Sequence, residues 1–378
     1  MKKVMIVFGT RPEAIKMCPL VNELKKRADM QTIVCITGQH REMLHQVLDA
    51  FNVVPDYDLG IMKTGQDLFD ITSAVLTGLK SVFSSESPDI VLVHGDTGTA
   101  FSATLAAYYL NIPVGHVEAG LRTYDLQSPF PEEFNRRAIS LISRLHFAPT
   151  IAAADNLLRE GHSAQSVIVT GNTAIDALRT TVRTDYHHPL FDWISEHRLI
   201  LITAHRRENW GAPMIGQFRA IRRVLEEHPD VRAIYPVHLN PLIRDAAHDV
   251  FDNCDQIQII EPLDVLDFHN FMNHSYLILT DSGGIQEEAP ALGKPVLVMR
   301  DTTERPEGLA AGTLKLVGTD EETLYKEFTQ LLDDKQAYQS MSHAANPYGD
   351  GHASERIADV LENYCFSSSP QVSTQKPL

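Results

Sequence analysis

The segment YLILTDSGGIQEEAPALGKPVLVM, residues 276–299, holds the pattern that decides the fold. It begins with a short apolar run, breaks at Ser282, Gly283 and Gly284, continues with helix-forming residues and ends in a second apolar run. Continuous apolar runs are typical of parallel strands that are buried on both faces. We therefore interpret the segment as strand, helix and strand of a parallel sheet, with the glycines at the turn into the helix.

The same alternation of apolar runs and helical spacing extends over most of the chain. Further predicted strands occupy residues 3–9, 31–37, 89–95, 113–119, 144–149, 166–171, 199–205, 231–238, 257–262 and 313–318. The pattern lapses at residues 183–198, which we interpret as a linker. The sequence thus predicts an α/β protein with two Rossmann-like, doubly wound parallel-sheet domains that face each other across a cleft.

The predicted linker sets the expected domain limits. We place the N-terminal domain at residues 1–182 and the C-terminal domain at 199–352. A C-terminal helix at 353–366 is expected to pack back on the N-terminal domain. Residues 367–378 have almost nothing to bury, so we expect a disordered tail.

The composition limits the possible partners and the compartment. Hydrophobic residues make up 43% of the 378 residues and charged residues 22%, as in ordinary globular proteins. The net charge of -16 argues against binding to nucleic acid or to an anionic membrane. The 4 cysteines have neither metal-ligand nor disulfide spacing, and no apolar run suits a signal peptide or a membrane span. We expect a cytoplasmic protein.

Parallel sheets bring their functional residues to the carboxyl ends of the strands. Those ends carry GTRPEAIK, HGDTGTA, VEAGLRT and PFPEEFNRR in the first domain, and AHRREN, VHLNP and TDSGGIQEE in the second. None of them is a G-x-G-x-x-G dinucleotide fingerprint or a G-x-x-x-x-G-K-[ST] phosphate loop. We therefore expect no nicotinamide cofactor, no other cofactor and no metal site.

The glycine turn suits a ligand that is anionic at one end only. Free backbone N–H groups at Ser282, Gly283 and Gly284 favour a diphosphate. Glu288, one turn further on, can accept hydrogen bonds from a neutral diol such as a ribose. The pattern therefore predicts a nucleoside diphosphate site.

Positive groups at other strand ends can contact phosphate as well. Arg11 and Lys16 lie about one helical turn apart near the start of a predicted helix. His205 ends a strand of the second domain beside Arg206 and Arg207. A cluster of this kind favours phosphate contact, although a single surface cation would not.

Three carboxylates, Asp96, Glu118 and Glu132, lie at or just after strand ends of the first domain. If they converge, they should raise one another's pKa values. That is how acid and base roles are separated at neutral pH.

Taken together, long stretches of this chain resemble the non-hydrolysing UDP-N-acetylglucosamine 2-epimerase family. They are GTRPEAIKM, HGDT, HVEAGLRT, PEEFNRR, AHRREN, DSGGIQEEAPALGKPVLV, RDTTERPE and NPYGDG, within about residues 2–362. The resemblance implies a fold of the glycosyltransferase B type and usually a homodimer. It implies a cytoplasmic enzyme that interconverts UDP-N-acetylglucosamine and UDP-N-acetylmannosamine for cell-surface polysaccharide.

The resemblance also implies roles for particular residues. The catalytic carboxylates are Asp96, Glu118 and Glu132, and the groups facing the phosphates are Arg11, Lys16 and His205. The UDP pocket comprises Ser282, Gly283, Gly284, Glu288 and Arg305, with Phe268 beside the uracil. A second, regulatory substrate site maps onto Gln39, His40, Glu132, Arg206 and His238.

Two positions depart from the regulated members of the family. Glu42 stands where such members have Gln, and Gly65 stands where they have Arg. Loss of that arginine removes a phosphate contact, and Glu42 adds negative charge. We therefore predict weaker or differently built substrate activation.

The chemistry of the predicted reaction agrees with these residue types. The carbon that bears the acetamido group has no adjacent carbonyl, so departure of UDP must help to acidify its proton. Elimination would give a glycal, which is reprotonated on the other face as UDP returns; cations and carboxylates suit this path. A hydrolysing epimerase, a glycosyltransferase of the same fold and a noncatalytic sugar-nucleotide sensor remain alternatives. The order of base and acid, the pathway and a modified UDP-sugar as substrate also stay open.

Overall fold

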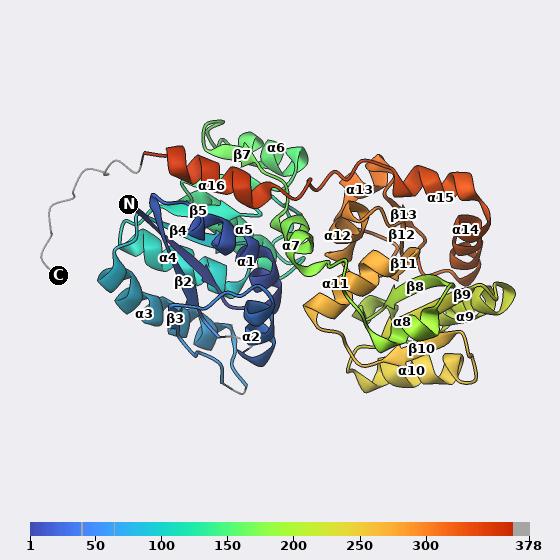
Figure 1. Ribbon diagram of the computed structural model, residues 1–378. Helices are drawn as coiled ribbons and strands as arrows, with labels where there is room; N and C mark the ends of the chain where they lie inside the picture. The colour runs from blue at the N-terminus through green and yellow to red at the C-terminus, as the bar shows by residue number, and fades with distance from the viewer. Residues whose placement is uncertain (39–40, 64, 366–378) are drawn as a thin grey trace, which may run out of the picture. The chain divides into compact units, whose positions relative to one another are not determined.

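The computed structural model describes residues 1–38, 41–63 and 65–365 (Figure 1). The chain forms two units, each built on its own parallel sheet. The first unit comprises residues 1–173 and the chain from His352 onward, and the second comprises residues 174–351. The prediction of two α/β domains with parallel sheets is confirmed.

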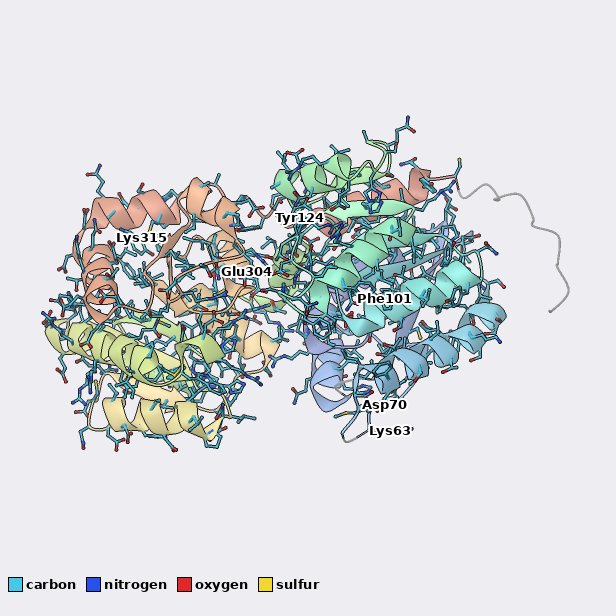
Figure 2. All side chains as sticks on the ribbon, turned by 180° about the vertical axis from the view of Figure 1, so that it is seen from behind. Lys63, Asp70, Phe101, Tyr124, Glu304 and Lys315 are labelled. Atoms are coloured by element: carbon cyan, nitrogen blue, oxygen red, sulfur yellow. The ribbon has the colours of Figure 1, made fainter. Side chains whose placement is uncertain are left out.

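The sheet of the first unit has the order β3-β2-β1-β4-β5-β6-β7, and every pairing is parallel. Its strands are β1 (Lys2–Phe8), β2 (Met30–Ile36), β3 (Tyr57–Asp58), β4 (Ile90–His94), β5 (Val114–Val117), β6 (Leu145–Ala148) and β7 (Val167–Val169). Its helices are α1 (Arg11–Lys25), α2 (Arg41–Ala50), α3 (Leu68–Glu86), α4 (Gly98–Tyr109), α5 (Glu132–Ile142), α6 (Ile151–Arg159) and α16 (Ala353–Asn363). Phe101 of α4, labelled in Figure 2, packs edge-on against Phe134 of α5 with ring centroids 5.6 Å apart.

The second unit repeats this plan with the parallel order β10-β9-β8-β11-β12-β13. Its strands are β8 (Arg198–Thr203), β9 (Val231–Pro236), β10 (Ile257–Ile260), β11 (Leu277–Thr280), β12 (Val296–Val298) and β13 (Leu314–Leu316). Its helices are α7 (Thr173–Thr181), α8 (Pro189–Ile194), the 3-10 turn η1 (Arg207–Asn209), α9 (Ala212–Glu227), α10 (Pro241–Phe251), α11 (Val265–His274), α12 (Ile285–Ala291), α13 (Pro306–Ala311), α14 (Glu321–Asp333) and α15 (Lys335–Ser342).

Residues 183–198, predicted as a linker, contain helix α8. Ile194 is buried in a core cluster of the second unit, and Phe191 and Trp193 pack against that cluster. Helix α7 is held in the same unit, because Asn270 Nδ2 donates to the Thr181 carbonyl at 2.8 Å. The contacts therefore divide the chain at Thr173, earlier than the sequence pattern suggests.

Helix α16 packs against α1 of the first unit. Its last carbonyl groups accept hydrogen bonds from Nζ of Lys2, at 3.2 Å from Leu361 and 2.5 Å from Glu362. Arg27, just after α1, lies 2.9 Å from the Glu362 carboxylate. The predicted tail, residues 367–378, lies outside the described residues.

In both sheets the strand order reverses between two neighbouring strands, β1 and β4 in one and β8 and β11 in the other. Open parallel sheets bind ligands at such a point, beyond the carboxyl ends of the strands. The loops that follow these four strands begin at Gly9, Gly95, Ala204 and Asp281. In the described part of the chain, no helix is both long and apolar enough to cross a bilayer.

Candidate functional site

Glu118 lies directly after β5, and its backbone has a positive φ of 62°. Its Oε2 forms an ion pair with Nζ of Lys16 from α1. The same oxygen accepts a hydrogen bond of 3.1 Å from Nδ2 of Asn172, which follows β7. It also lies 3.7 Å from Nε2 of His94 at the end of β4. Donors from α1 and from the loop after β7 therefore fix this carboxylate beside His94.

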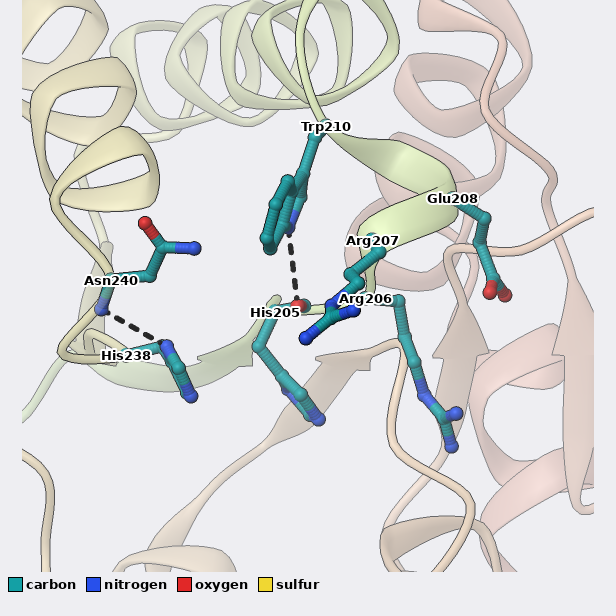
Figure 3. Close-up of a pocket in the computed structure, with 7 residues that line it drawn as sticks. All are labelled: His205, Arg206, Arg207, Glu208, Trp210, His238 and Asn240. Carbon is teal, nitrogen blue, oxygen red and sulfur yellow. Dashed lines mark hydrogen bonds between the residues drawn. The ribbon is translucent and has the colours of Figure 1, made fainter. Parts of the chain in front are cut away.

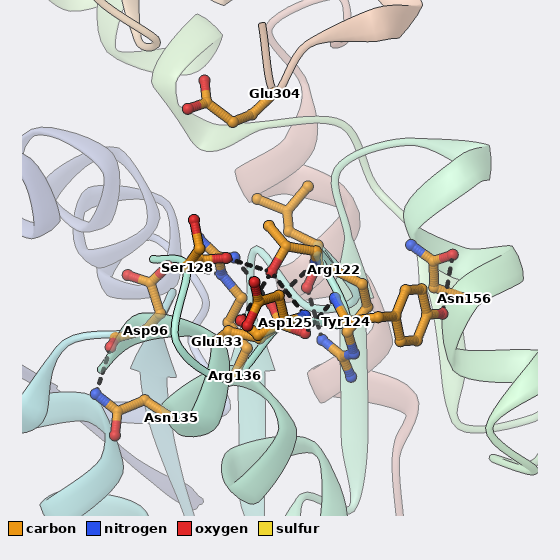
Figure 4. Close-up of polar contacts among 12 residues, drawn as sticks. Asp96, Arg122, Tyr124, Asp125, Ser128, Glu133, Asn135, Arg136, Asn156 and Glu304 are labelled. Carbon is orange, nitrogen blue, oxygen red and sulfur yellow. Dashed lines mark hydrogen bonds and ion pairs between the residues drawn. The ribbon is translucent and has the colours of Figure 1, made fainter. Parts of the chain in front are cut away.

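Asp96 follows β4 and is the second carboxylate at this edge of the sheet (Figure 4). It accepts a 2.8 Å hydrogen bond from Nε of Arg136, and its carbonyl accepts one of 2.8 Å from Nδ2 of Asn135. Although its side chain is still 25% exposed, burial raises its pKa above the ordinary value. Arg136 opposes that shift, whereas the charge of Glu118 adds to it. Asp96 therefore holds a proton more readily than an exposed aspartate.

Two histidines beneath these carboxylates are buried and neutral. Burial lowers the pKa of His94 to about 4 and that of His116 to about 3. A ring nitrogen of His116 lies 2.7 Å from the carbonyl oxygen of Gly95. Neutral imidazoles here let Glu118 keep Lys16 as its charged partner.

Glu132, predicted as the third catalytic carboxylate, is the half-buried first residue of α5. Its neighbour Glu133 is fully buried and accepts hydrogen bonds from the backbone N–H groups of Thr123 at 3.0 Å and Tyr124 at 3.1 Å. Glu133 also lies 3.1 Å from Nη1 of Arg136 (Figure 4). Glu133 therefore orients the guanidinium that Asp96 contacts, a role the sequence analysis did not assign.

Arg11 is the first residue of α1, which begins with a capping box of Thr10 and Glu13. Glu13 accepts hydrogen bonds from the Gly9 N–H at 3.0 Å and from Oγ1 of Thr97 at 2.7 Å. Burial raises the pKa of Glu13. These bonds connect the turn after β1 to the turn after β4. They therefore fix the backbone at Arg11 relative to the backbone at Asp96. The T-x-x-E pattern in the sequence is the signal for this arrangement.

In the second unit, His205 lies after β8 and Asp281 lies after the adjacent β11. Nδ1 of His205 is 3.1 Å from Oδ1 of the fully buried Asp281. Oδ2 of Asp281 accepts hydrogen bonds from the backbone N–H groups of His205 at 2.7 Å and Arg206 at 2.8 Å. The sequence motif contains Asp281 but indicates no role for it. In the structure, Asp281 is the group that holds His205.

His205 and Arg206 line a pocket of about 460 Å³ together with Arg207, Glu208, Trp210, His238 and Asn240 (Figure 3). The rings of His205 and His238 are nearly parallel, with centroids 6.0 Å apart. Trp210 Nε1 lies 3.3 Å from the His205 carbonyl oxygen. The pocket thus gathers several cationic or cation-capable side chains, as an anionic ligand requires.

The glycine turn precedes α12, as predicted. A Cβ atom on Gly283 would lie 4.0 Å from its nearest neighbour, Nη2 of Arg305, and one on Gly284 would lie 3.8 Å from Oε1 of Glu288. Neither glycine has a positive φ. The surrounding protein therefore does not require glycine at these positions, and the missing side chains leave space open above the turn.

The two glutamates after the turn have different surroundings. Glu287 is buried and forms an ion pair with Nε of Arg305, which fixes that guanidinium near Gly283. Glu288 lies 3.7 Å from Nε2 of the buried His269. The neighbouring Phe268 packs partly buried against a core cluster of the second unit.

The structure thus gathers the predicted residues of each unit at the carboxyl edge of its own sheet. Gln39 and His40 lie outside the described residues, and the catalytic, substrate-binding and regulatory assignments stay predictions. Within residues 1–38, 41–63 and 65–365, no group of three or more His, Cys, Asp or Glu side chains is arranged to hold a metal ion.

Known proteins resemble this chain over nearly its whole length. The family model for UDP-N-acetylglucosamine 2-epimerase matches residues 22–362. A UDP-N-acetylglucosamine 2-epimerase of Bacillus subtilis (strain 168) is 62% identical over 359 residues, which cover 95% of this chain and 94% of the relative. These matches confirm the family and the activity predicted from the sequence.

Solved structures agree with the sequence matches. S. aureus MnaA, in a co-structure with UDP, has a TM-score of 0.88 and 52% identity, with 96% of each chain covered. The UDP-GlcNAc 2-epimerase of Neisseria meningitidis, bound to UDP-GlcNAc, has a TM-score of 0.86 and 49% identity and covers 96% of this chain and 100% of its own. By sequence and by fold, the chain belongs to the UDP-N-acetylglucosamine 2-epimerase family.

Proposed function

We propose that this chain interconverts UDP-N-acetylglucosamine and UDP-N-acetylmannosamine by eliminating UDP and adding it back. A base takes the proton from C-2, the C-1 to oxygen bond breaks with its electron pair leaving on UDP, and a C-1=C-2 double bond forms. UDP oxygen then re-forms the bond to C-1 while a proton is delivered to the other face of C-2. Atoms and charge balance, so the path requires no redox cofactor.

The carboxylates of the first unit carry this proposal. Asp96 and Glu118 follow adjacent strands but have different surroundings, since burial raises the pKa of Asp96 while Glu118 is ion-paired with Lys16. A carboxyl group with a raised pKa beside an ion-paired carboxylate suits an acid and a base. Glu132, at the first position of α5, is the third member of this set.

We assign UDP binding to the second unit. The open space above Gly283 and Gly284 lets a diphosphate approach the backbone, with Arg305 fixed nearby by Glu287. We propose that Glu288 accepts hydrogen bonds from the ribose and that Phe268 lies beside the uracil. His205 supplies a further positive group for the leaving diphosphate. Relatives solved with UDP or with UDP-GlcNAc support a ligand of this class.

One incubation separates the possible functions. The protein is mixed with UDP-N-acetylglucosamine in heavy water, and the products are followed by NMR. We expect the epimer with one deuterium at C-2 and small amounts of free UDP and glycal. Free UDP plus sugar would indicate the hydrolysing epimerase, and an epimer that keeps its original hydrogen would reject elimination. No reaction without an acceptor would favour a glycosyltransferase or a sensor.

We also propose a homodimer, whose interface lies on α3, α4 and α5 of the first unit. These helices are neighbours, and they carry Phe69, Tyr108, Tyr109, Phe134 and Leu141 with exposed fractions between 47% and 84%. Monomers rarely expose so many large apolar groups on adjacent helices. A second copy of the chain, working in the cytoplasm, is the occupant we propose.

Light scattering after gel filtration tests the dimer. The wild type should have twice the 42.2 kDa mass of one chain, and Leu141→Glu should shift it toward one chain. Val54→Glu is the control, because Val54 is 76% exposed but lies outside the three helices. A wild type that elutes as a monomer would contradict the proposal.

The regulatory site is proposed on the pocket residues Arg206 and His238, with Gln39 and His40. Gly65 lacks the arginine side chain of the regulated members of the family, and its φ is 78°. Replacing it by arginine in this backbone conformation would introduce strain. We expect substrate activation that is weaker than in members with that arginine. Strict dependence of the reverse reaction on added UDP-N-acetylglucosamine would contradict this expectation.

A further inference from the structure

Asp281 is connected to the loop after β8 by each of its carboxylate oxygens. It is fully buried, its Oδ2 accepts the backbone N–H groups of His205 and Arg206, and its Oδ1 lies 3.1 Å from Nδ1 of His205. The two strands that carry these residues are held together by a 2.6 Å hydrogen bond between the hydroxyl groups of Thr203 and Thr280. The spacing between carboxylate and imidazole is thus set by the sheet.

The carboxyl group of Asp281 is an acceptor in this environment. Burial alone would raise its pKa, but the hydrogen bond and charge of His205, with the two backbone N–H groups, lower the pKa below its ordinary value. An ionised carboxylate can only accept hydrogen bonds. Within the described part of the chain, Oδ1 has no other hydrogen-bond partner and lies 3.1 Å from Nδ1 of His205, so this contact favours the ring form with a hydrogen on Nδ1.

This arrangement leaves Nε2 as the nitrogen that His205 presents to the pocket. The ring is 38% exposed and lines the pocket with His238 and Arg206 (Figure 3). Its backbone is held on one side by Asp281 and on the other by Trp210.

We propose that Asp281 is a positioning residue that acts through His205. It fixes a hydrogen on Nδ1, so that the second hydrogen of the ring in its protonated form, on Nε2, faces the leaving diphosphate. The same carboxylate–imidazole logic orients the histidine of serine proteases. The inference rests on the role of His205 in the proposed function.

The tautomer can be read directly in the wild type. Protein labelled with ¹⁵N-histidine is recorded at several pH values, and the His205 signals are identified as those missing from His205→Gln. We expect Nδ1 to be protonated throughout and the hydrogen on Nε2 to be gained on acidification. A neutral ring with its hydrogen on Nε2 would overturn the proposal, even if every Asp281 variant failed to fold.

A double-mutant cycle tests whether Asp281 acts through His205. Asp281→Asn keeps an acceptor for the two backbone N–H groups but turns an amide toward Nδ1. We expect kcat to fall about 10- to 100-fold with UDP affinity largely kept, and the tautomer signal to change. In the His205→Gln background the same substitution should change kcat less than about twofold. Additive losses would show a merely structural role and overturn the proposal.

The matched control is Asp264→Asn. Asp264 caps α11 and accepts a hydrogen bond of 2.8 Å from the backbone N–H of Asp267. Among the described residues, it has no hydrogen bond to a histidine of the pocket. It should change stability and leave the pH profile unchanged. Full activity of His205→Gln would reject the leaving-group role of His205, while the wild-type spectrum would still decide whether Asp281 sets its tautomer.

Discussion

Asp96 and Asp281 occupy corresponding places in two similar sheets, yet their proton affinities shift in opposite directions. Each follows the strand next to the reversal of strand order, β4 in one unit and β11 in the other. Burial raises the pKa of Asp96, and the guanidinium of Arg136 does not offset it. At Asp281, hydrogen bonds from His205 and from the backbone outweigh burial and lower the pKa. Hydrogen-bond donors, more than position in the fold, thus decide whether a buried aspartate can exchange protons.

This contrast extends to the surroundings of the two residues. The first unit places Asp96 and Glu118 above buried neutral histidines, which suits proton transfer. In the second unit, the buried carboxylate of Asp281 holds His205 and the backbone of Arg206. The histidine and the arginine line the pocket, and such side chains suit an anionic ligand. The same plan of strand, turn and helix therefore offers two different chemical environments.

The largest expected effect comes from removing the groups proposed to transfer protons. Asp96→Asn and Glu118→Gln should each lower turnover by about two to four powers of ten, the usual contribution of a positioned acid or base. UDP affinity should stay nearly unchanged, because UDP is assigned to the second unit. Initial rates of epimer formation and calorimetric titration with UDP measure the two quantities.

Asp29→Asn is the control for these variants, since Asp29 is an exposed aspartate of the same unit. It should keep the wild-type rate. Wild-type turnover in Asp96→Asn would remove Asp96 from the mechanism and leave the comparison with Asp281 as one of stability only.

Both sheets could be predicted because their strands are continuous apolar runs that leave a strong signal in the sequence. Strand β3, only Tyr57–Asp58, could not be predicted, because it forms by pairing beside β2 and has no apolar run of its own. Helix α8 was also missed, because it is only 6 residues long and its stability comes from packing in the second unit.

The candidate site could be predicted where residues follow strands in recognisable motifs, as Asp96, Glu118 and His205 do. The groups that orient them could not be predicted, because they come from distant parts of the chain. Asn172 reaches Glu118 from the loop after β7, and Asp281 reaches His205 across two neighbouring strands. Such pairs depend on sheet order, which a single sequence does not display.

Removing the hydrogen bond from Asn172 to Glu118 should have a smaller effect on turnover than removing a carboxylate. Asn172→Ala should lower kcat about 10- to 100-fold, because a hydrogen bond to a charged group typically contributes about 1.5–3 kcal/mol. KM should change less, and the pH dependence of kcat should shift. Asn22→Ala is the control, since Asn22 donates to the Phe51 carbonyl at 2.9 Å and is not part of the site. Equal losses in both variants would indicate a structural role for Asn172.

The open space above the glycine turn can be filled without strain. Gly283→Ala should weaken UDP binding about fivefold to tenfold and leave the melting temperature nearly unchanged, because the protein leaves 4.0 Å to the nearest atom. Gly216→Ala in α9 is the control, since its Cβ would make an ordinary contact of 3.6 Å with Glu321. Calorimetry and thermal unfolding give the two readouts. Unchanged UDP affinity would place the diphosphate elsewhere.

The last expected effect is a difference in acid stability between the units. Burial lowers the pKa of His94 and His146 to about 4 and that of His116 to about 3, from 6.5. Below pH 6.5 these histidines bind protons in the unfolded chain but not in the folded first unit. The stability that the neutral histidines contribute is therefore complete above pH 6.5 and is lost progressively toward pH 4. Each histidine removes up to about 1.4 kcal/mol of unfolding free energy per pH unit. Asp281, with its lowered pKa, contributes stability above the ordinary aspartate value of 3.8 and loses it only below that pH.

Hydrogen exchange followed by mass spectrometry at pH 7 and pH 5, corrected for intrinsic rates, should therefore show protection lost first in β4, β5 and β6. His146→Gln should reduce the pH dependence of that loss, because it removes one buried group that titrates. His343→Gln, an exposed position of the second unit, should behave like the wild type. If β8 and β11 lost protection at the same pH as β4 and β5, the buried histidines would not govern acid stability, and the electrostatic contrast between the units would be confined to the two aspartates.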